Sequence, residues 1–177
     1  MNDDQQTLTR LLDLVRKEDK HLLAVRRRLL EDDCRVTDER LSTMLDTDIG
    51  IDRLESFGAK FGRMQDTVID KLIPALLRTA GEATGAAIDN LNRMERLGLV
   101  HSVDEWLQMR RLRNRLVHEY IDKPAELTPV LERACHFTDR MHEDFQAIDT
   151  YATTHLLNGP VQSSALASRA KVRRRDR

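Results

Sequence analysis

The sequence predicts an all-α protein that folds as an up-and-down antiparallel helical bundle. Apolar residues recur at intervals of three and four along nearly the whole chain, which is the period of one helix face. Aromatic residues make up only 4%, and 7 Gly and 4 Pro are few for the turns and packed strands of a sandwich or barrel. Because 177 residues suit one domain, we expect a single bundle over residues 1–157.

The first two helices follow from their apolar positions and end signals. A long leading helix is predicted over residues 5–33, with arginines and acids on its polar faces. Thr37 or Asp38 is suited to cap a short second helix that ends near Gly50.

The third and fourth helices carry clear stop signals. The apolar stripe over residues 51–76 predicts an amphipathic helix with a kink at Pro74 and an end near Gly81. A fourth helix over residues 87–97 ends at Gly98, which is placed as a C-terminal cap.

Two further helices and a tail complete the chain. Residues 102–105 match a capping box, so a fifth helix is predicted over residues 103–122. Pro124 ends that helix and suits the first turn of the sixth helix. Residues 158–177 have no apolar stripe, and we expect a disordered basic tail.

The charge balance excludes histone-like coating of nucleic acid. Lys and Arg number 29 against 30 Asp and Glu, a net charge of −1, which still permits a local basic cleft. The polar, acidic N-terminus lacks the pattern of a signal peptide, so a cytoplasmic location is expected. The longest apolar run, residues 72–77, is far below the roughly 18–20 residues that span a bilayer.

Familiar catalytic and metal-binding motifs are absent. No Gly-rich phosphate loop, H-E-x-x-H or G-x-S-x-G sequence occurs, and no metal or cofactor is expected. Cys34 and Cys135 form no C-x-x-C pattern, so we interpret both as ordinary thiols rather than zinc ligands or a disulfide. Trp106 is interpreted as core or dimer-interface packing. Structural roles are expected for five histidines: His21, His101, His136, His142 and His155.

The fifth helix gathers the residues that could do chemistry. One short stretch holds four arginines together with Asn114, His118 and Tyr120. The four arginines are Arg110, Arg111, Arg113 and Arg115. Asn114 and His118 lie one turn apart, whereas Arg113 and His118 are about 140° apart around the helix. A two-fold dimer through this helix would supply the second surface needed at one phosphate. Imidazole can move the proton of a ribose 2′-hydroxyl, and guanidinium can neutralise the phosphate, so metal-free RNA cleavage is the reaction indicated.

The spacing Arg-x-x-x-x-His alone is weak evidence for a catalytic site, because it also occurs at residues 16–21 and 96–101. Only residues 113–120 add a polar residue after the Arg and a Tyr two residues past the His. This stretch resembles the Arg-x-x-x-x-His-x-Tyr signature of HEPN domains, specifically the HepT-like toxins. The similarity extends over roughly residues 37–135.

The resemblance implies a HEPN-like bundle that dimerises through the motif helix, and a metal-independent endoribonuclease that acts as the toxin of a toxin–antitoxin pair. In this picture Arg113 and His118 are catalytic and Asn114 supports them. The partner implied is an MntA-type nucleotidyltransferase antitoxin, which silences the toxin by transferring AMP from ATP to Tyr120. A bulky anion there would obstruct an incoming RNA phosphate.

Three alternatives stay open. Arg110, Arg111 and Arg115 are predicted to bind RNA phosphates, but a solvated polar face explains them equally well. The chain could instead be a non-catalytic substrate-binding or scaffold subunit of a nucleotidyltransferase. It could also be a purely structural helical dimer, with Tyr120 as an ordinary packing residue.

Overall fold

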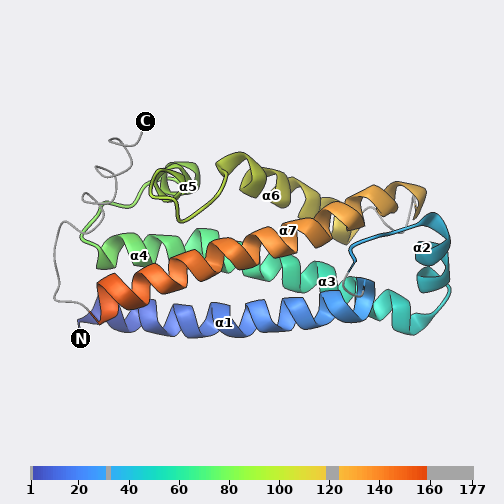
Figure 1. Cartoon of the computed structure of the whole chain (residues 1–177), viewed down its shortest axis with the longest axis horizontal. Coiled ribbons are helices and arrows are strands. Elements are labelled where there is room, and N and C mark those ends of the chain that lie inside the picture. The colour runs from blue at the N-terminus through green and yellow to red at the C-terminus, as the bar shows by residue number, and fades with distance from the viewer. Residues whose placement is uncertain (1, 31–32, 119–123, 159–177) are drawn as a thin grey trace. The chain divides into compact units, whose positions relative to one another are not determined.

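The computed structural model describes residues 2–30, 33–118 and 124–158, and helices are the only regular secondary structure in these ranges (Figure 1). The prediction of an all-α helical bundle is confirmed. The elements are α1 (Asp3–Leu30), α2 (Asp38–Leu45), α3 (Asp48–Thr67), η1 (Val68–Leu72), α4 (Ile73–Thr79), α5 (Ala87–Arg96), α6 (Val103–His118), α7 (Pro124–Tyr151) and η2 (Ala152–Leu157).

Several helix ends lie where local signals predict them. Thr37 is the N-cap of α2, and its hydroxyl accepts a hydrogen bond from the backbone N–H of Arg40 at 3.1 Å. Gly81 and Gly98 follow α4 and α5 with φ of 75° and 68°, a left-handed conformation that glycine adopts without penalty. Pro124 begins α7, as predicted.

The third predicted helix is interrupted by a π-helical turn. α3 passes into η1 and then into α4, which has Pro74 in its first turn. Proline lacks an N–H and crowds the carbonyl four residues earlier, so the α-helical pattern cannot continue through it. The backbone N–H of Ile73 instead donates to the carbonyl of Val68, five residues back. The expected disturbance at Pro74 is therefore a change of helix type just before it.

The leading helix is predicted to end at residue 33, but the described helix ends at Leu30. Asp33 lies in a turn, where its carboxylate accepts a hydrogen bond from the backbone N–H of Arg35 at 3.0 Å. Cys34 has φ of 51°, a left-handed conformation incompatible with a continuing helix. The predicted motif helix is described as far as His118; residues 119–122 and the predicted tail from residue 159 lie outside the described ranges.

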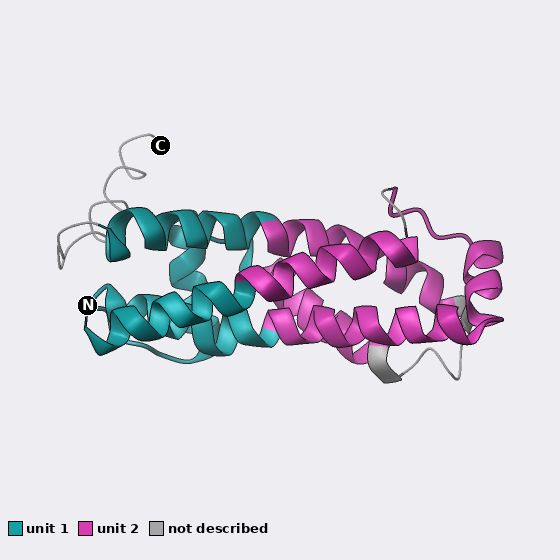
Figure 2. Cartoon of the chain, turned by 90° about the horizontal axis from the view of Figure 1, so that it is seen from below, with its two compact units in different colours: residues 1–15, 66–103, 143–177 teal, residues 16–65, 104–142 magenta. Residues whose placement is uncertain are grey.

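The chain divides into two compact units (Figure 2). Unit 1 combines residues from 1–15, 66–103 and 143–177, and unit 2 combines 16–65 with 104–142. Large side chains without solvent exposure form the core of each. In unit 1 these include Leu8, Leu12, Leu72 and Ile73; in unit 2 they include Leu54, Phe57, Phe61, Met64 and Trp106.

Side-chain contacts establish antiparallel helix pairs within unit 2. Asp19 and Arg26 of α1 contact His142 and Asp139 of α7, so residue numbers rise on one helix as they fall on the other. The helices α6 and α7 pair likewise, because Glu105 and Arg115 of α6 contact Arg140 and Glu126 of α7. Among the described residues, no helix is both long enough and apolar enough to cross a membrane.

Candidate functional site

The helix α6 is anchored in unit 2 by one apolar face. Trp106, Met109, Leu112 and Leu116 are buried, at the spacing of one helix face. Trp106 is fully buried, and its backbone carbonyl accepts a hydrogen bond from the side-chain amide of Gln65 in α3 at 3.0 Å. Trp106 is therefore a core residue, as expected, and has no exposed face on which a base could stack.

The remaining surface of α6 carries the three arginines predicted to bind RNA, together with Asn114. Arg110, Arg111, Asn114 and Arg115 are exposed. A guanidinium nitrogen of Arg115 lies 3.9 Å from a carboxylate oxygen of Glu126 in α7, and about half of each side chain is exposed. Such an exposed pair contributes at most about 1 kcal/mol, so this ion pair is a weak competitor of a phosphate for Arg115.

Arg113 differs from these residues because it is half-buried against α3. A Cβ atom placed on Gly62 would lie 3.0 Å from both Cδ and Nε of Arg113. The bare backbone at Gly62 thus makes room for the arginine stem. Sequence reasoning missed Gly62, although a glycine inside a predicted helix is a signal of close approach, since it costs about 1 kcal/mol relative to alanine.

The structure brings some of the predicted site residues together and leaves others undescribed. His118 is the last residue of α6. It follows Asn114 by four residues and Arg111 by seven, so the backbone positions of all three lie on one face of the helix. Arg113 is about 100° from Asn114 around the helix and lies against α3. The side chain of His118, and the whole of Tyr120, lie outside what the structure describes.

Two other histidines are held by buried carboxylates. In unit 2, Nδ1 of His142 lies 2.8 Å from Oδ2 of Asp19. Burial raises the pKa of the Asp19 carboxyl above its ordinary value, although the hydrogen bond and charge of His142 oppose that shift. In unit 1, Nδ1 of His101 contacts the fully buried carboxylate of Asp144. These contacts fit the structural roles expected for both histidines.

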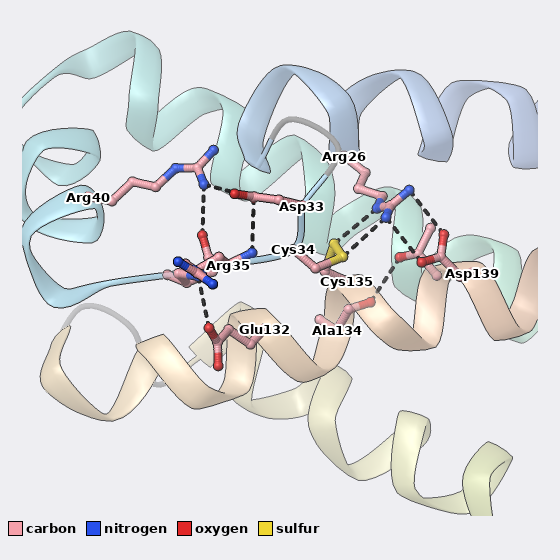
Figure 3. The surroundings of a disulfide bond; sticks show 11 residues. Arg26, Asp33, Cys34, Arg35, Arg40, Glu132, Ala134, Cys135 and Asp139 are labelled. Atoms are coloured by element: carbon pink, nitrogen blue, oxygen red, sulfur yellow. Dashed lines mark hydrogen bonds and ion pairs between the residues drawn. A yellow bond between two sulfur atoms is a disulfide. The ribbon is translucent and has the colours of Figure 1, made fainter.

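The interpretation of the cysteines as separate thiols is wrong: Cys34 and Cys135 form a disulfide (Figure 3). Their Cα atoms lie 5.5 Å apart, although 101 positions separate them in the sequence. The antiparallel course of α1 and α7 brings the turn after α1 beside the first half of α7. The spacing of the two cysteines in the sequence does not indicate that they lie close together in the fold.

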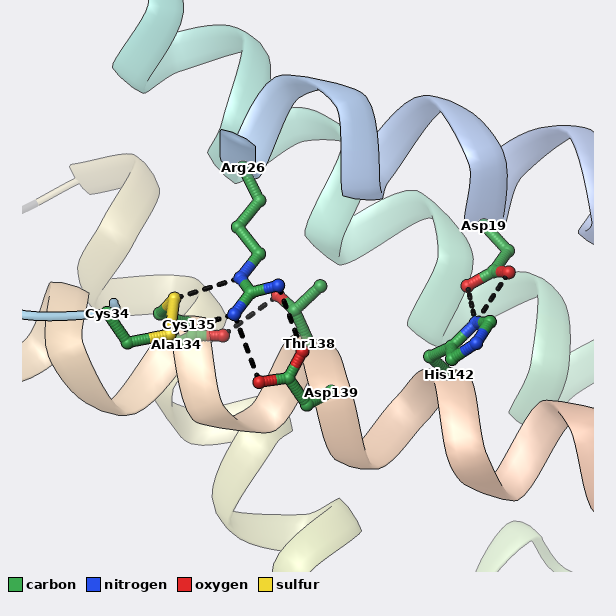
Figure 4. A network of polar contacts seen from close by, with 8 residues as sticks. All are labelled: Asp19, Arg26, Cys34, Ala134, Cys135, Thr138, Asp139 and His142. Atoms are coloured by element: carbon green, nitrogen blue, oxygen red, sulfur yellow. Dashed lines mark hydrogen bonds and ion pairs between the residues drawn. A yellow bond between two sulfur atoms is a disulfide. The ribbon is translucent and has the colours of Figure 1, made fainter. Parts of the chain in front are cut away.

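Arg26 of α1 binds both sulfurs and a neighbouring carboxylate (Figure 4). Its Nε donates to Sγ of Cys135 at 3.0 Å, and its Nη2 donates to Sγ of Cys34 at 3.1 Å. Its Nη1 and Nη2 also lie 3.0 and 3.1 Å from the two carboxylate oxygens of Asp139. The side chain of Arg26 is only 14% exposed. This bidentate geometry holds the guanidinium in one orientation beside the sulfurs.

Comparison with known proteins adds no relative: no family model, curated protein or solved structure matches this chain. Inference about function therefore depends on the residues of α6 and their surroundings.

Proposed function

We propose that this protein is a HEPN-type, metal-independent endoribonuclease and the toxin of a toxin–antitoxin pair. The observation that carries the proposal is the exposed face of α6, where Arg110, Arg111 and Asn114 share one helix with the motif residues Arg113 and His118. The buried face of the same helix fixes it in unit 2, so these groups are presented on a rigid element.

The reaction proposed is transfer of a phosphate ester to the ribose 2′-oxygen. His118 takes the 2′-hydroxyl proton, the 2′-oxygen bonds to phosphorus, and the bond to the 5′-oxygen breaks as that oxygen takes a proton from water. Arg113 neutralises the phosphate, and Asn114 supports the site by hydrogen bonding. The products are a 2′,3′-cyclic phosphate and a 5′-hydroxyl.

A homodimer can bring together catalytic groups that a single helix holds on different faces. Arg113 lies against α3, about 140° from the line of His118 around α6. In a two-fold dimer through α6, Arg113 of one protomer and His118 of the other can reach the same phosphate. The exposed Arg110, Arg111 and Arg115 then bind flanking phosphates of the RNA.

RNA cleavage in the presence of a chelator tests the activity. We expect the full chain to cut single-stranded RNA in EDTA, and His118→Ala to cut it about 100-fold or more slowly. His21→Ala is the matched control, because His21 is an exposed histidine on α1. A substrate with 2′-deoxyribose at the cut position should stay intact. If the unaltered protein binds a nucleotidyltransferase but leaves all RNA intact, it is the scaffold subunit and not the nuclease.

Silencing by adenylation is the second part of the proposal. Co-expression with an MntA-type nucleotidyltransferase should add one or more AMP groups to the chain, mapped by mass spectrometry to the peptide that contains Tyr120. Tyr120→Phe should remove the gain in mass. Tyr151, the chain's other tyrosine, is buried and serves as the control. An unchanged gain in Tyr120→Phe would contradict this mechanism.

A further inference from the structure

Four side chains with metal-binding atoms meet beside the turn that follows α1. The ligand atoms of Cys34, His136 and Asp139 all lie within 4.8 Å of one another. The sulfur of Cys135 is bonded to that of Cys34, so it lies directly beside this group. Two sulfurs, an imidazole nitrogen and a carboxylate oxygen are a donor set that tetrahedral Zn²⁺ accepts. No metal-binding motif is visible in the sequence because Cys34 lies far along the chain from the other three residues, which fall at positions 135–139.

The disulfide and a metal cannot occupy these sulfurs together. Only thiolates bind Zn²⁺ strongly, so the S–S bond must first be broken. A thiol reductant supplies the two electrons: the S–S bond breaks, Cys34 and Cys135 become thiols, and two reductant thiols join as a disulfide. Zn²⁺ then displaces both cysteine protons to solvent. Disulfides are rare in reducing compartments, where paired cysteines more often bind metal.

The surroundings suit a bound cation in spite of the nearby arginine. Arg26 donates to both sulfurs and to the carboxylate of Asp139, which is how an outer-shell residue orients metal ligands. Each carboxylate oxygen has two lone pairs, so Asp139 can accept from Arg26 and still bind a metal. Two thiolates, one carboxylate, Arg26 and Zn²⁺ together carry no net charge. The exposed His136 leaves the site open to an entering ion, while both cysteines are buried.

We propose that reduction of the disulfide converts this cluster into a zinc site with Cys34, Cys135, His136 and Asp139 as its ligands and Arg26 as their outer-shell donor. The turn after α1 is then tethered to α7 in either state, by the S–S bond when oxidised and by zinc when reduced. This site is independent of the chemistry proposed for α6.

Zinc content of the full chain, prepared oxidised and reduced, tests the proposal. After equilibration with Zn²⁺ and dialysis, elemental analysis should find one zinc per reduced chain and none per oxidised chain. Alkylation and intact mass verify the thiol state. Co²⁺ in place of Zn²⁺ should give sulfur-to-cobalt charge-transfer absorption in the reduced protein alone.

Variants locate the metal. His136→Ala alters an exposed side chain and should fold, yet it should weaken zinc binding about tenfold or more. His21→Ala, an exposed histidine of α1, should bind zinc like the unaltered protein. Absence of zinc from the reduced chain would overturn the proposal. Equal zinc affinity in His136→Ala and the unaltered protein, or equal binding by the oxidised chain, would overturn it as well.

Discussion

Gly62→Ala tests whether Arg113 packs on the bare backbone of α3. The new Cβ would lie 3.0 Å from Cδ and Nε of Arg113 and 3.2 Å from its Cγ, so the arginine must move by a few tenths of an ångström. Alanine improves helix propensity by about 1 kcal/mol, while an off-rotamer arginine costs about 0.5–1.5 kcal/mol. We therefore expect the free energy of unfolding to stay within about 1 kcal/mol of the unaltered protein, measured by urea denaturation.

A double-mutant cycle isolates the contact. In an Arg113→Ala background the neighbour is gone, so Gly62→Ala should stabilise by the full propensity gain of about 1 kcal/mol. Gly50→Ala is the contrast, because its Cβ would lie 1.9 Å from the backbone carbonyl oxygen of Met44, and about 1–3 kcal/mol should be lost as the backbone shifts. Packing of Arg113 on Gly62 is contradicted if Gly62→Ala destabilises as much as Gly50→Ala, or if Arg113→Ala leaves the effect of Gly62→Ala unchanged.

Three further predictions concern the disulfide and two carboxylates. Reduction in EDTA should lower the free energy of unfolding by about 2–5 kcal/mol, because the Cys34–Cys135 link closes a long loop; urea denaturation with and without reductant measures it, and an unchanged midpoint would contradict it. The pKa of buried Asp19 is raised, so its contribution to the free energy of unfolding is full below pH of about 4 and is lost as the pH rises. Measured relative to Asp19→Asn, the unaltered protein should therefore lose stability between acid and neutral pH. The pKa of Asp33 is lowered by its hydrogen bond from the Arg35 backbone, so its contribution to the free energy of unfolding is present above pH of about 4 and is lost in acid. The destabilisation by Asp33→Asn should therefore fade as the pH drops. A pH dependence of opposite sign for either the Asp19 or the Asp33 variant would refute that assignment.

Local signals predicted the helices well because each depends on a few adjacent residues. Thr37 caps α2 by accepting a hydrogen bond from the backbone N–H of Arg40, only three residues later. Gly98 ends α5 because it adopts a left-handed conformation. The burial of Trp106 and the exposure of Asn114 likewise follow from helix periodicity. These features require no knowledge of which helices are neighbours.

Features that depend on tertiary contacts were not predictable in this way. The Cys34–Cys135 bond requires that α1 and α7 run antiparallel in one particular register, which apolar periodicity does not specify. The packing of Arg113 on Gly62 depends in the same way on how α6 crosses α3. For the candidate site, the sequence therefore predicted which residues share α6, but not that Arg113 lies against a neighbouring helix.

The most direct test of the proposed composite nuclease site is complementation between two inactive variants. Arg113→Ala and His118→Ala proteins should each fail to cleave RNA in EDTA. When their subunits are mixed and allowed to exchange, each heterodimer regains one intact site, with Arg113 from one protomer and His118 from the other. We expect cleavage to return in the mixture and to rise with the fraction of heterodimer. A mixture that forms heterodimers yet remains as inactive as either variant would contradict it.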